Sequence, residues 1–417
     1  MSNEPNFLNI DKYMYPMSGK IKSIDIYNVS EKTSEKSSPW SSTMLIVKIT
    51  TDDGMVGYGE APTTLMTLPV LESIKEVMRI FVGRDVRNVT ANVLEFYRHS
   101  FYLSRSMEAT SALSAVEIAS WDIVGKYAGE PIYNLLGGKV RDSVRAYSNG
   151  WYSDCVTPDD FIRKAKGIHK QGFTAVKFDP FGNNYDKIDR KGIDNAEAIV
   201  RGLRDEFDYD LDLLIEFHGR YSFEAARKIV ERLDPYDCLF FEEPLHPELE
   251  MRLPELRSLV QTPIALGERV LNARDFMRHI VEGKVDIIQA DLTNTRGIME
   301  SFKVAAIADS WGVAMAYHNA FGPVQTAATL NLDTTINNFL IQESFEASWP
   351  EWKKNLVKGY EISNGQFRLS GKPGLGIEMD EKSLKDHMVD GMEPFDPESP
   401  PWVVSGTYVG EANNGKK

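Results

Sequence analysis

The 417-residue chain has few cysteines, no long apolar run and no excess of basic residues. Its two cysteines, Cys155 and Cys238, are too few and too far apart to indicate a disulfide framework or a thiolate metal site. No apolar stretch approaches the roughly 20 residues that a membrane helix needs, and the polar N-terminal segment lacks the apolar core of a signal peptide. We therefore expect a cytoplasmic protein.

The charge balance argues against another large class of proteins. Lys and Arg number 47 against 61 Asp and Glu, which gives a formal net charge of −14. A nucleic-acid-binding protein would show clustered Lys and Arg, so we expect neither nucleic acid nor membrane as a partner. The length allows two domains, or one barrel with an appendage, and a large buried core. These features fit an ordinary soluble enzyme.

The first third of the chain shows a mixed pattern of strands and helices. Residues 21–29 and 43–51 have strand patterns, and Asp53-Gly54 supplies a tight turn into a third strand that begins at residue 55. Apolar residues at helical spacing follow, most clearly over residues 111–127. We predict an α+β domain over residues 1–140 that starts with an antiparallel meander.

From about Ala146, strand and helix patterns alternate. After a unit near Ala146, strands are expected at residues 175–179, 213–217, 239–242, 264–268, 286–291, 313–318 and 339–343. Such alternation implies a parallel sheet with right-handed crossovers, and eight units close naturally into a barrel, with an open sheet as the alternative. We predict an α/β fold with a barrel over residues 141–365. Residues 366–417, which are rich in Pro and Gly, are expected to pack back on the first domain.

Three glutamates end successive strands of the predicted barrel. Glu216, Glu242 and Glu268 each close a short apolar run, and they follow one another at an even spacing of 26 residues. Because the C-terminal ends of barrel strands converge on one face, three carboxylates there would surround one point, which suits Mg²⁺. The alternative is that each glutamate merely marks the place where a strand reaches solvent. The regular spacing favours a metal site.

Other ionisable residues end the neighbouring strands. Residues two apart on a strand point to the same side, so pairs such as 177 and 179, or 216 and 218, can both face inward. The ionisable residues at these strand ends are Lys177, Asp179, His218, Asp291, His318 and Glu343.

These groups suit the removal of a proton next to a carboxylate. The product is an enediolate with a second negative charge, which Mg²⁺ and Lys177 would stabilise. His318 held by Asp291 would be the general base. His218, on the other side of the metal by strand order, would donate a proton to a leaving hydroxyl. For single residues a structural role is the alternative: a satisfied buried histidine for His318, a solvated strand end for Lys177 and a turn for Asp179.

Several segments carry a resemblance to a known family. They are Ile215-Glu216-Phe217-His218-Gly219-Arg220, Phe241-Glu242-Glu243-Pro244, Leu266-Gly267-Glu268-Arg269, Gln289-Ala290-Asp291-Leu292-Thr293 and Tyr317-His318-Asn319-Ala320-Phe321-Gly322. They resemble the enolase superfamily, mandelate racemase subgroup, and within it the dehydratases of galactonate and gluconate. Two more segments are similar to the archaeal gluconate dehydratases of the non-phosphorylated Entner–Doudoroff route. These are Ala175-Val176-Lys177-Phe178-Asp179-Pro180-Phe181-Gly182 and Pro401-Trp402-Val403-Val404-Ser405-Gly406-Thr407.

The resemblance implies a modified (β/α)7β TIM barrel under an α+β capping domain that the C-terminal tail completes. By position, the ligands of Mg²⁺ fall on Glu216, Glu242 and Glu268. The catalytic residues fall on His318, Asp291, His218, Glu343 and Lys177. Substrate-binding residues are predicted at Lys177, Asp179, Arg269 and Asn319. The resemblance also implies a homo-octamer.

Two departures from the family pattern bear on the reaction. The first metal ligand, often Asp, is here Glu216, and the second basic residue of the Lys-x-Lys pair in racemases is here Asp179. The loss of that base disfavours two-base racemisation, and the presence of His218 favours elimination. We predict Mg²⁺-dependent dehydration of D-gluconate to 2-keto-3-deoxygluconate, with D-galactonate as a second candidate substrate. The alternatives are another aldonate such as xylonate or arabinonate, epimerisation of a sugar acid, and a catalytically silent barrel that serves as a binding protein.

Overall fold

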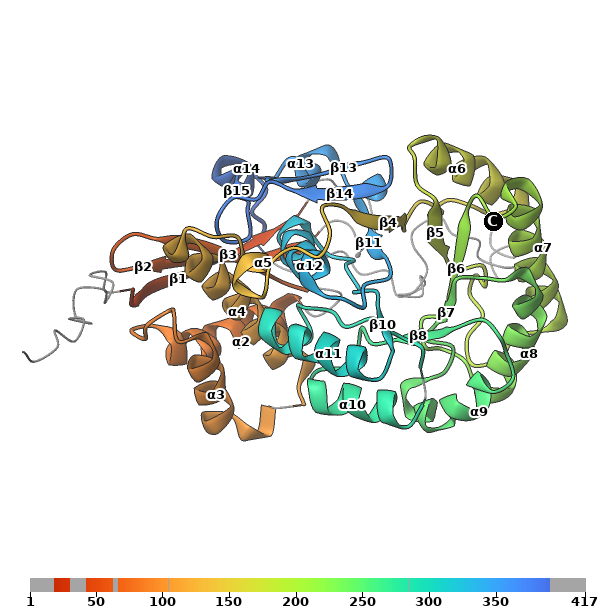
Figure 1. The fold of residues 1–417 in the computed structure, drawn as a ribbon, viewed down its shortest axis with the longest axis horizontal. Coiled ribbons are helices and arrows are strands. Elements are labelled where there is room, and N and C mark those ends of the chain that lie inside the picture. Colours follow the sequence, from red (N-terminus) through yellow and green to blue (C-terminus); the bar gives the residue numbers. More distant parts are fainter. Residues whose placement is uncertain (1–18, 31–42, 63–66, 104, 284, 391–417) are drawn as a thin grey trace, which may run out of the picture.

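The computed structural model describes residues 19–30, 43–62, 67–103, 105–283 and 285–390. Figure 1 shows an N-terminal capping region in red to orange beside a ring of strands and helices, with the blue C-terminal segment above their junction. The segment 401–407, on which part of the family resemblance depends, lies outside the described residues.

The capping region begins with an antiparallel sheet. Its strands β1 (Ile21–Val29), β2 (Met44–Thr51) and β3 (Val56–Ala61) pair in chain order, and helices α2 (Thr67–Phe81), α3 (Val89–His99) and α4 (Met107–Ala128) follow. Helix α4 packs closely on β3, because a Cβ at Gly59 would lie only 1.9 Å from the carbonyl oxygen of Ala115. This helix starts four residues before the predicted 111–127, because the Ser106 hydroxyl accepts the amide of Ala109 and caps an earlier turn.

Eight parallel strands form the barrel in chain order. They are β4 (Val144–Ser148), β5 (Ala175–Phe178), β6 (Asp212–Glu216), β7 (Phe240–Glu242), β8 (Ile264–Leu266), β9 (Ile287–Ile288), β10 (Ala314–Met315) and β11 (Gln342–Ser344). Strand β11 pairs with β4, and a parallel bridge from Met315 to Phe339 joins β10 to the chain that leads into β11. The ring is therefore closed, as predicted, and the open-sheet alternative is wrong.

Seven helices follow the first seven barrel strands and lie outside them. They are α6 (Pro158–Lys170), α7 (Arg190–Phe207), α8 (Phe223–Leu233), α9 (Leu253–Arg257), α10 (Ala273–Val281), α11 (Ile298–Ser310) and α12 (Pro323–Thr335). Helix α6 starts with Thr157 and Asp160 in a reciprocal capping box. The order is that of a (β/α)7β barrel. Among the described residues, no helix is both long and apolar enough to cross a membrane.

A layer of mostly apolar side chains fills the barrel interior beneath the C-terminal strand ends. Each strand, or the residue directly beside it, contributes one member: Tyr147, Ala175, Leu214, Phe240, Ala265, Ile287, Ala316 and Ile341. Because strand side chains alternate, the residue two positions further on also faces the interior. This rule places polar residues directly above the apolar layer, at the C-terminal face.

The C-terminal segment contacts both the barrel and the cap. Strands β13 (Tyr360–Ser363) and β14 (Gln366–Leu369) form a hairpin, and β14 pairs with β4 of the barrel. Further on, strand β15 (Glu378–Met379) pairs with β12 (Val357–Lys358), and α14 (Glu381–Asp386) contacts β1 of the cap. The Glu381 carboxylate accepts from Lys48 and Tyr58 of the cap, both at 2.6 Å. The division into residues 1–140, 141–365 and 366–417 stays a prediction.

Candidate active site

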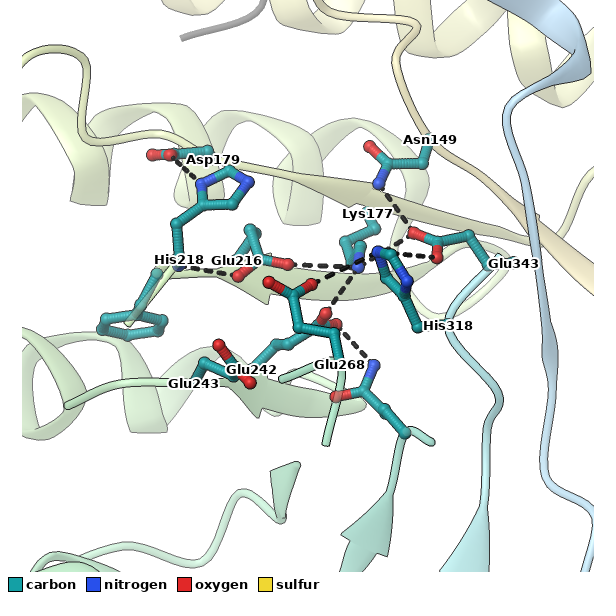
Figure 2. Close-up of polar contacts among 12 residues, drawn as sticks. Asn149, Lys177, Asp179, Glu216, His218, Glu242, Glu243, Glu268, His318 and Glu343 are labelled. Atoms are coloured by element: carbon teal, nitrogen blue, oxygen red, sulfur yellow. Dashed lines mark hydrogen bonds and ion pairs between the residues drawn. The ribbon is translucent and has the colours of Figure 1, made fainter. Parts of the chain in front are cut away.

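Lys177 lies at the centre of a cluster of buried carboxylates above the apolar layer. Its Nζ is 2.7 Å from Glu242 Oε1, 2.9 Å from Glu343 Oε1 and 3.1 Å from Glu216 Oε2. The side chain is 2% exposed. Figure 2 shows the Lys177 ammonium between these carboxylates, which come from three other strands.

The charges of this cluster perturb one another strongly. Burial alone would lower the pKa of Lys177, but the carboxylates of Glu242 and Glu343 outweigh it and hold the pKa well above its usual value. Burial and the neighbouring charge of Glu216 raise the pKa of Glu242 well above its usual range. Glu216 has a lowered pKa, because Lys177 overcomes the effect of burial. The cluster therefore has more carboxylates than Lys177 alone can balance.

The three predicted metal ligands have the right chemistry for Mg²⁺. Glu216, Glu242 and Glu268 supply hard oxygen donors on adjacent strand ends, and the pKa of Glu268 is also raised, first by burial. Within the described ranges, no three acidic, histidine or cysteine side chains already stand close enough to ligate one ion. As they stand, Glu216 and Glu242 bind Lys177, and Glu268 lies beside His318. The donor set fits a divalent cation by its charge and burial.

His318 and Asp291 form a buried pair on one side of the glutamates. Nδ1 of His318 is 2.6 Å from Asp291 Oδ2, and its Nε2 is 3.3 Å from Glu268 Oε2. Thr293 donates through its amide and its hydroxyl to Asp291 Oδ1, at 2.7 and 2.5 Å. Burial alone would lower the pKa of His318, but Glu268, Glu343 and Asp291 raise it to about 10. The second nitrogen of the ring faces the cluster.

His218 forms a second pair on the opposite side of the glutamates, with Asp179 (Figure 2). Its Nδ1 is 2.8 Å from Asp179 Oδ2. Its backbone φ of 52° is in the left-handed region, and its amide donates to Glu216 Oε1 at 2.7 Å. This turn directs the amide to a predicted ligand and the ring to Asp179. Such a conformation costs energy in a non-glycine residue and is often found at functional sites.

Asp179, predicted to bind substrate, is engaged by other residues of the protein. Both its oxygens accept from the guanidinium of Arg220, at 2.7 and 2.9 Å, in addition to the contact with His218. Burial alone would raise the pKa of Asp179, but Arg220 and then His218 lower it. The sequence analysis did not predict a role for Arg220 at the site. Its position two residues after His218 could have indicated that the two side chains lie close together. The contacts give Asp179 the position of an orienting residue for the imidazole.

Glu343 is held by two asparagines. Asn149 Nδ2 donates to Glu343 Oε1 at 2.8 Å, and the backbone amide of Asn319 donates to Oε2 at 2.8 Å. The side chain of Asn319 donates to Thr326 Oγ1 and to the carbonyl oxygen of Glu343, both at 3.1 Å. These contacts already engage the side-chain amide of Asn319. The role of Asn319 in substrate binding stays a prediction. Asn149 was not predicted; it lies two residues after Tyr147 of the apolar layer.

Arg269 and His246 lie further from the centre. The Arg269 guanidinium pairs with Glu243, and its Nη1 is 3.4 Å from the carbonyl oxygen of His218. Arg269 also lies 3.9 Å from Glu268, so a contact with substrate at the edge of the site stays a prediction. Nε2 of His246 lies 3.8 Å from Asp186 Oδ1.

A pocket connects the two histidines with the glutamates. Its lining residues are Asn149, Tyr152, Lys177, Glu216, His218, Glu268, His318, Ala320 and Phe345. Most of these side chains are polar or charged, which suits a small polar ligand. Tyr152 is one of the two aromatic residues that line this pocket, the other being Phe345.

The comparison with family models identifies the class of protein. A model described as enolase C-terminal domain-like matches residues 160–383, and one for the N-terminal domain of mandelate racemase / muconate lactonizing enzyme matches residues 29–137. The chain belongs to the enolase superfamily, in its mandelate racemase and muconate lactonizing enzyme group.

Two relatives and one solved structure are similar over most of the chain. A D-gluconate/D-galactonate dehydratase of Picrophilus torridus is 60% identical over 388 residues, which cover 93% of this chain and 99% of the relative. A D-gluconate dehydratase of Thermoproteus tenax is 41% identical, over 90% of this chain and 76% of the relative. A mandelate racemase/muconate lactonizing enzyme of Jannaschia sp. CCS1 has a TM-score of 0.83 and 29% identity, over 89% of this chain and 98% of the other. The predicted capped barrel is confirmed.

Proposed function

We propose that the protein is a hydro-lyase that removes water from a sugar acid, with D-gluconate as the first candidate substrate and D-galactonate as the second. Sequence similarity to sugar-acid dehydratases supports the reaction class. The observation that carries the mechanism is the placement of His218 and His318 on opposite sides of the glutamates. Such an arrangement allows one ring to take a proton while the other gives one.

His318 is the proposed general base. Its Nε2 would take the proton from C2, and the electrons of the C2–H bond would become those of an enediolate. Asp291 holds Nδ1 at 2.6 Å, so it fixes the tautomer and the direction of the ring. A base must be neutral before it acts, and Glu268 and Glu343 now hold the pKa of His318 at about 10. Engagement of Glu268 by a cation would reduce the negative charge beside the ring and so favour the neutral form of His318.

His218 is the proposed general acid. It would protonate the 3-hydroxyl as the C3–O bond breaks, so that water leaves and an enol remains. The enol then tautomerises to the 2-keto acid, which from D-gluconate is 2-keto-3-deoxygluconate. Asp179 and Arg220 hold the ring for this transfer. Proton transfer by a positioned side chain typically contributes about 10²- to 10⁴-fold in rate.

The enediolate needs compensation for its second negative charge. Lys177 supplies one buried positive charge directly below the proposed reaction centre. A magnesium ion held by Glu216, Glu242 and Glu268 would, when bound, supply Lewis-acid stabilisation of the substrate carboxylate. The family resemblance assigns Glu343, which Asn149 and Asn319 hold, to polarise the enediolate, and donation of a hydrogen bond there would require its protonated form.

A panel of aldonates tests the proposal. Purified protein with Mg²⁺ is incubated with gluconate, galactonate, xylonate and arabinonate, and the formation of 2-keto acid and the incorporation of solvent deuterium at C2 are measured. We expect keto acid from gluconate. Epimer formation without keto acid would favour the epimerase alternative, and inertness with every acid would contradict the proposed function.

The location and assembly of the enzyme are also proposals. The acidic net charge of −14 and the small-molecule substrate fit a cytoplasmic enzyme. The family resemblance supports a homo-octamer, which analytical ultracentrifugation of the full chain tests; a monomer at micromolar concentration would contradict it.

A further inference from the structure

Two barrel helices that follow the proposed base dyad begin at glycine. Helix α11 has Gly297 at its N-cap and α12 has Gly322, and neither N-cap supplies a side-chain hydrogen bond. The first amides of a helix need acceptors from elsewhere, and they attract negative charge. In both helices a buried glutamate of the capping region supplies that acceptor.

Glu117, on α4 of the cap, accepts from the first turn of α11. Its two oxygens accept from the amides of Ile298 and Met299, at 2.8 and 3.1 Å. Trp121 Nε1 donates to the same carboxylate at 2.9 Å. A Cβ at Gly297 would lie only 2.0 Å from Glu117 Oε2, so the glycine makes room for the carboxylate.

Glu60, on β3 of the cap, makes the equivalent contact with α12. Its Oε2 accepts from the amides of Val324 and Gln325, at 3.1 and 3.0 Å. A Cβ at Gly322 would lie 2.3 Å from Glu60 Oε1. Glu60 is fully buried, as is Glu117 within about 1%. Two elements of the cap therefore reach two consecutive barrel helices in the same way.

The first turn of α11 is joined to Asp291 by a short, internally bonded loop. The amides of Asn294 and Thr295 donate to the carbonyl oxygen of Asp291, at 3.0 and 2.7 Å, and the amide of Gly297 donates to that of Leu292 at 2.9 Å. A shift of the helix start would therefore move the backbone of Asp291.

The first turn of α12 is joined to His318 in a comparable way. Gln325, whose amide Glu60 accepts, uses its side chain to hold the loop: Nε2 donates to the carbonyl oxygen of His318 at 3.3 Å, and Oε1 accepts from the amide of Phe321 at 3.0 Å. The path from Glu60 to the backbone of His318 thus passes through one residue.

We propose that Glu60 and Glu117 are positioning residues for the Asp291–His318 dyad, through which the capping domain fixes the geometry of the base. The inference rests on the proposed function for its catalytic consequence. Keeping two carboxylates fully buried is costly, and burial raises the pKa of each to about 7. Simple attachment of the cap needs no such charge at these helix starts, since apolar contacts between β3 and α4 and the barrel would suffice.

Hydrogen–deuterium exchange of the backbone, measured by mass spectrometry, tests independently of activity whether Glu60 and Glu117 hold the loops that carry His318 and Asp291. Glu117→Ala should speed exchange in a peptide covering residues 291–300, and Glu60→Ala in one covering residues 318–327. The matched control is Asp122→Ala. Asp122 is an equally buried acid of α4 that accepts from the amides of Tyr58 and Leu375 and not from the start of a barrel helix. The control should leave both peptides unchanged.

The kinetic test compares the same variants well below the thermal midpoint of each. We expect Glu117→Ala and Glu60→Ala to lower kcat for C2 exchange by about 10- to 100-fold, with KM changed by less than about threefold. The corresponding Gln variants keep an acceptor for the helix amides and should recover most of kcat. Asp122→Ala should lower the thermal midpoint while kcat stays within about twofold of the wild type.

Variants with shorter side chains keep the inference testable if the alanine variants do not fold. Glu117→Asp and Glu60→Asp retain the buried charge and withdraw it by one methylene, so each should reduce kcat more than the Gln variant does. Wild-type C2 exchange in the Asp variants, or an equal loss in Asp122→Ala, would overturn the inference. If the wild type acts on no aldonate, the proposed function fails. Unchanged backbone exchange in the two loops would separately overturn the positioning role of Glu60 and Glu117.

Discussion

Two histidine–aspartate pairs flank the glutamates, and their surroundings differ. His318 is 7% exposed, its partner Asp291 is fully buried, and two glutamates face the ring. His218 is 20% exposed, and its partner Asp179 is shared with Arg220. The His318–Asp291 pair therefore lies in an enclosed and strongly negative environment. The His218–Asp179 pair lies in a more open one, where Arg220 balances the charge of the aspartate. The two rings therefore differ in exposure and in the charges that surround them, although each is oriented through Nδ1 by an aspartate.

Replacing His318, the more enclosed histidine, should have the largest effect on activity. His318→Asn should lower both C2 deuterium exchange and keto-acid formation by at least about 10³-fold, because the variant has no group that can accept the proton. Both rates are measured on gluconate. His99→Asn, a change of an exposed histidine on α3, is the matched control and should leave both rates unchanged. Wild-type exchange in His318→Asn would remove the base assignment.

The glutamates between the two rings should bind the cation. We expect chelation to abolish activity and Mg²⁺ to restore it, and at 100 times Kd the ion should stabilise the wild type by about 2.7 kcal/mol. Glu242→Gln, which removes one ligand charge, should lose most of this stabilisation in thermal unfolding measured with and without Mg²⁺. An equal Mg²⁺ effect in Glu242→Gln and the wild type would contradict the ligand assignment.

Proton donation by His218 should depend on how Asp179 orients the imidazole ring. Asp179→Asn weakens the hold on Nδ1 of His218, so we expect keto-acid formation to fall by about 10- to 100-fold while C2 exchange stays within about threefold. The thermal midpoint is recorded with both rates, because Arg220 loses its charged partner. A parallel fall of exchange and keto-acid formation would show that Asp179 serves both sides equally.

The smallest expected effect concerns stability at the cap. Burial raises the pKa of Glu117 from 4.5 to about 7, against the hydrogen bonds from Ile298, Met299 and Trp121 and with a contribution from Glu300. The folded protein thus holds this proton more tightly than the unfolded chain does. The resulting stabilisation is complete below pH 4.5 and is lost as pH rises through about 7, a change of about 3 kcal/mol.

The Glu117→Gln variant has no ionisable group at this position, so it is the reference for the wild type. The free energy of unfolding of the wild type relative to Glu117→Gln should therefore fall by about 3 kcal/mol between pH 4.5 and pH 8, measured by denaturant titration. A difference that does not change with pH would show that Glu117 keeps an ordinary pKa in the folded protein.

The sequence predicted features that repeat along the chain better than contacts between distant segments. The even spacing of Glu216, Glu242 and Glu268 and the alternation of strands and helices led to the barrel and to the position of its polar face. The pairing of His318 with Asp291 followed from adjacent strand ends. Each of these inferences needs only local periodicity and the rule that parallel strands end on one face.

Other features could not be read from the sequence because they depend on contacts between distant segments. Asp179 and Arg220 are 41 residues apart, and their pairing requires the exact path of two loops. Glu60 contacts the start of α12 across 264 residues, and no local pattern marks a strand glutamate as a helix cap. The pairing of β14 with β4 joins segments more than 200 residues apart, and no local pattern indicates it.

The ratio of C2 exchange to keto-acid formation in His218→Asn is the most direct test of a division of labour between the two rings. We predict that this variant still incorporates solvent deuterium at C2 of gluconate at close to the wild-type rate, while keto-acid formation falls by at least about 10²-fold. Loss of both activities in parallel, in a variant with the thermal midpoint of the wild type, would contradict it.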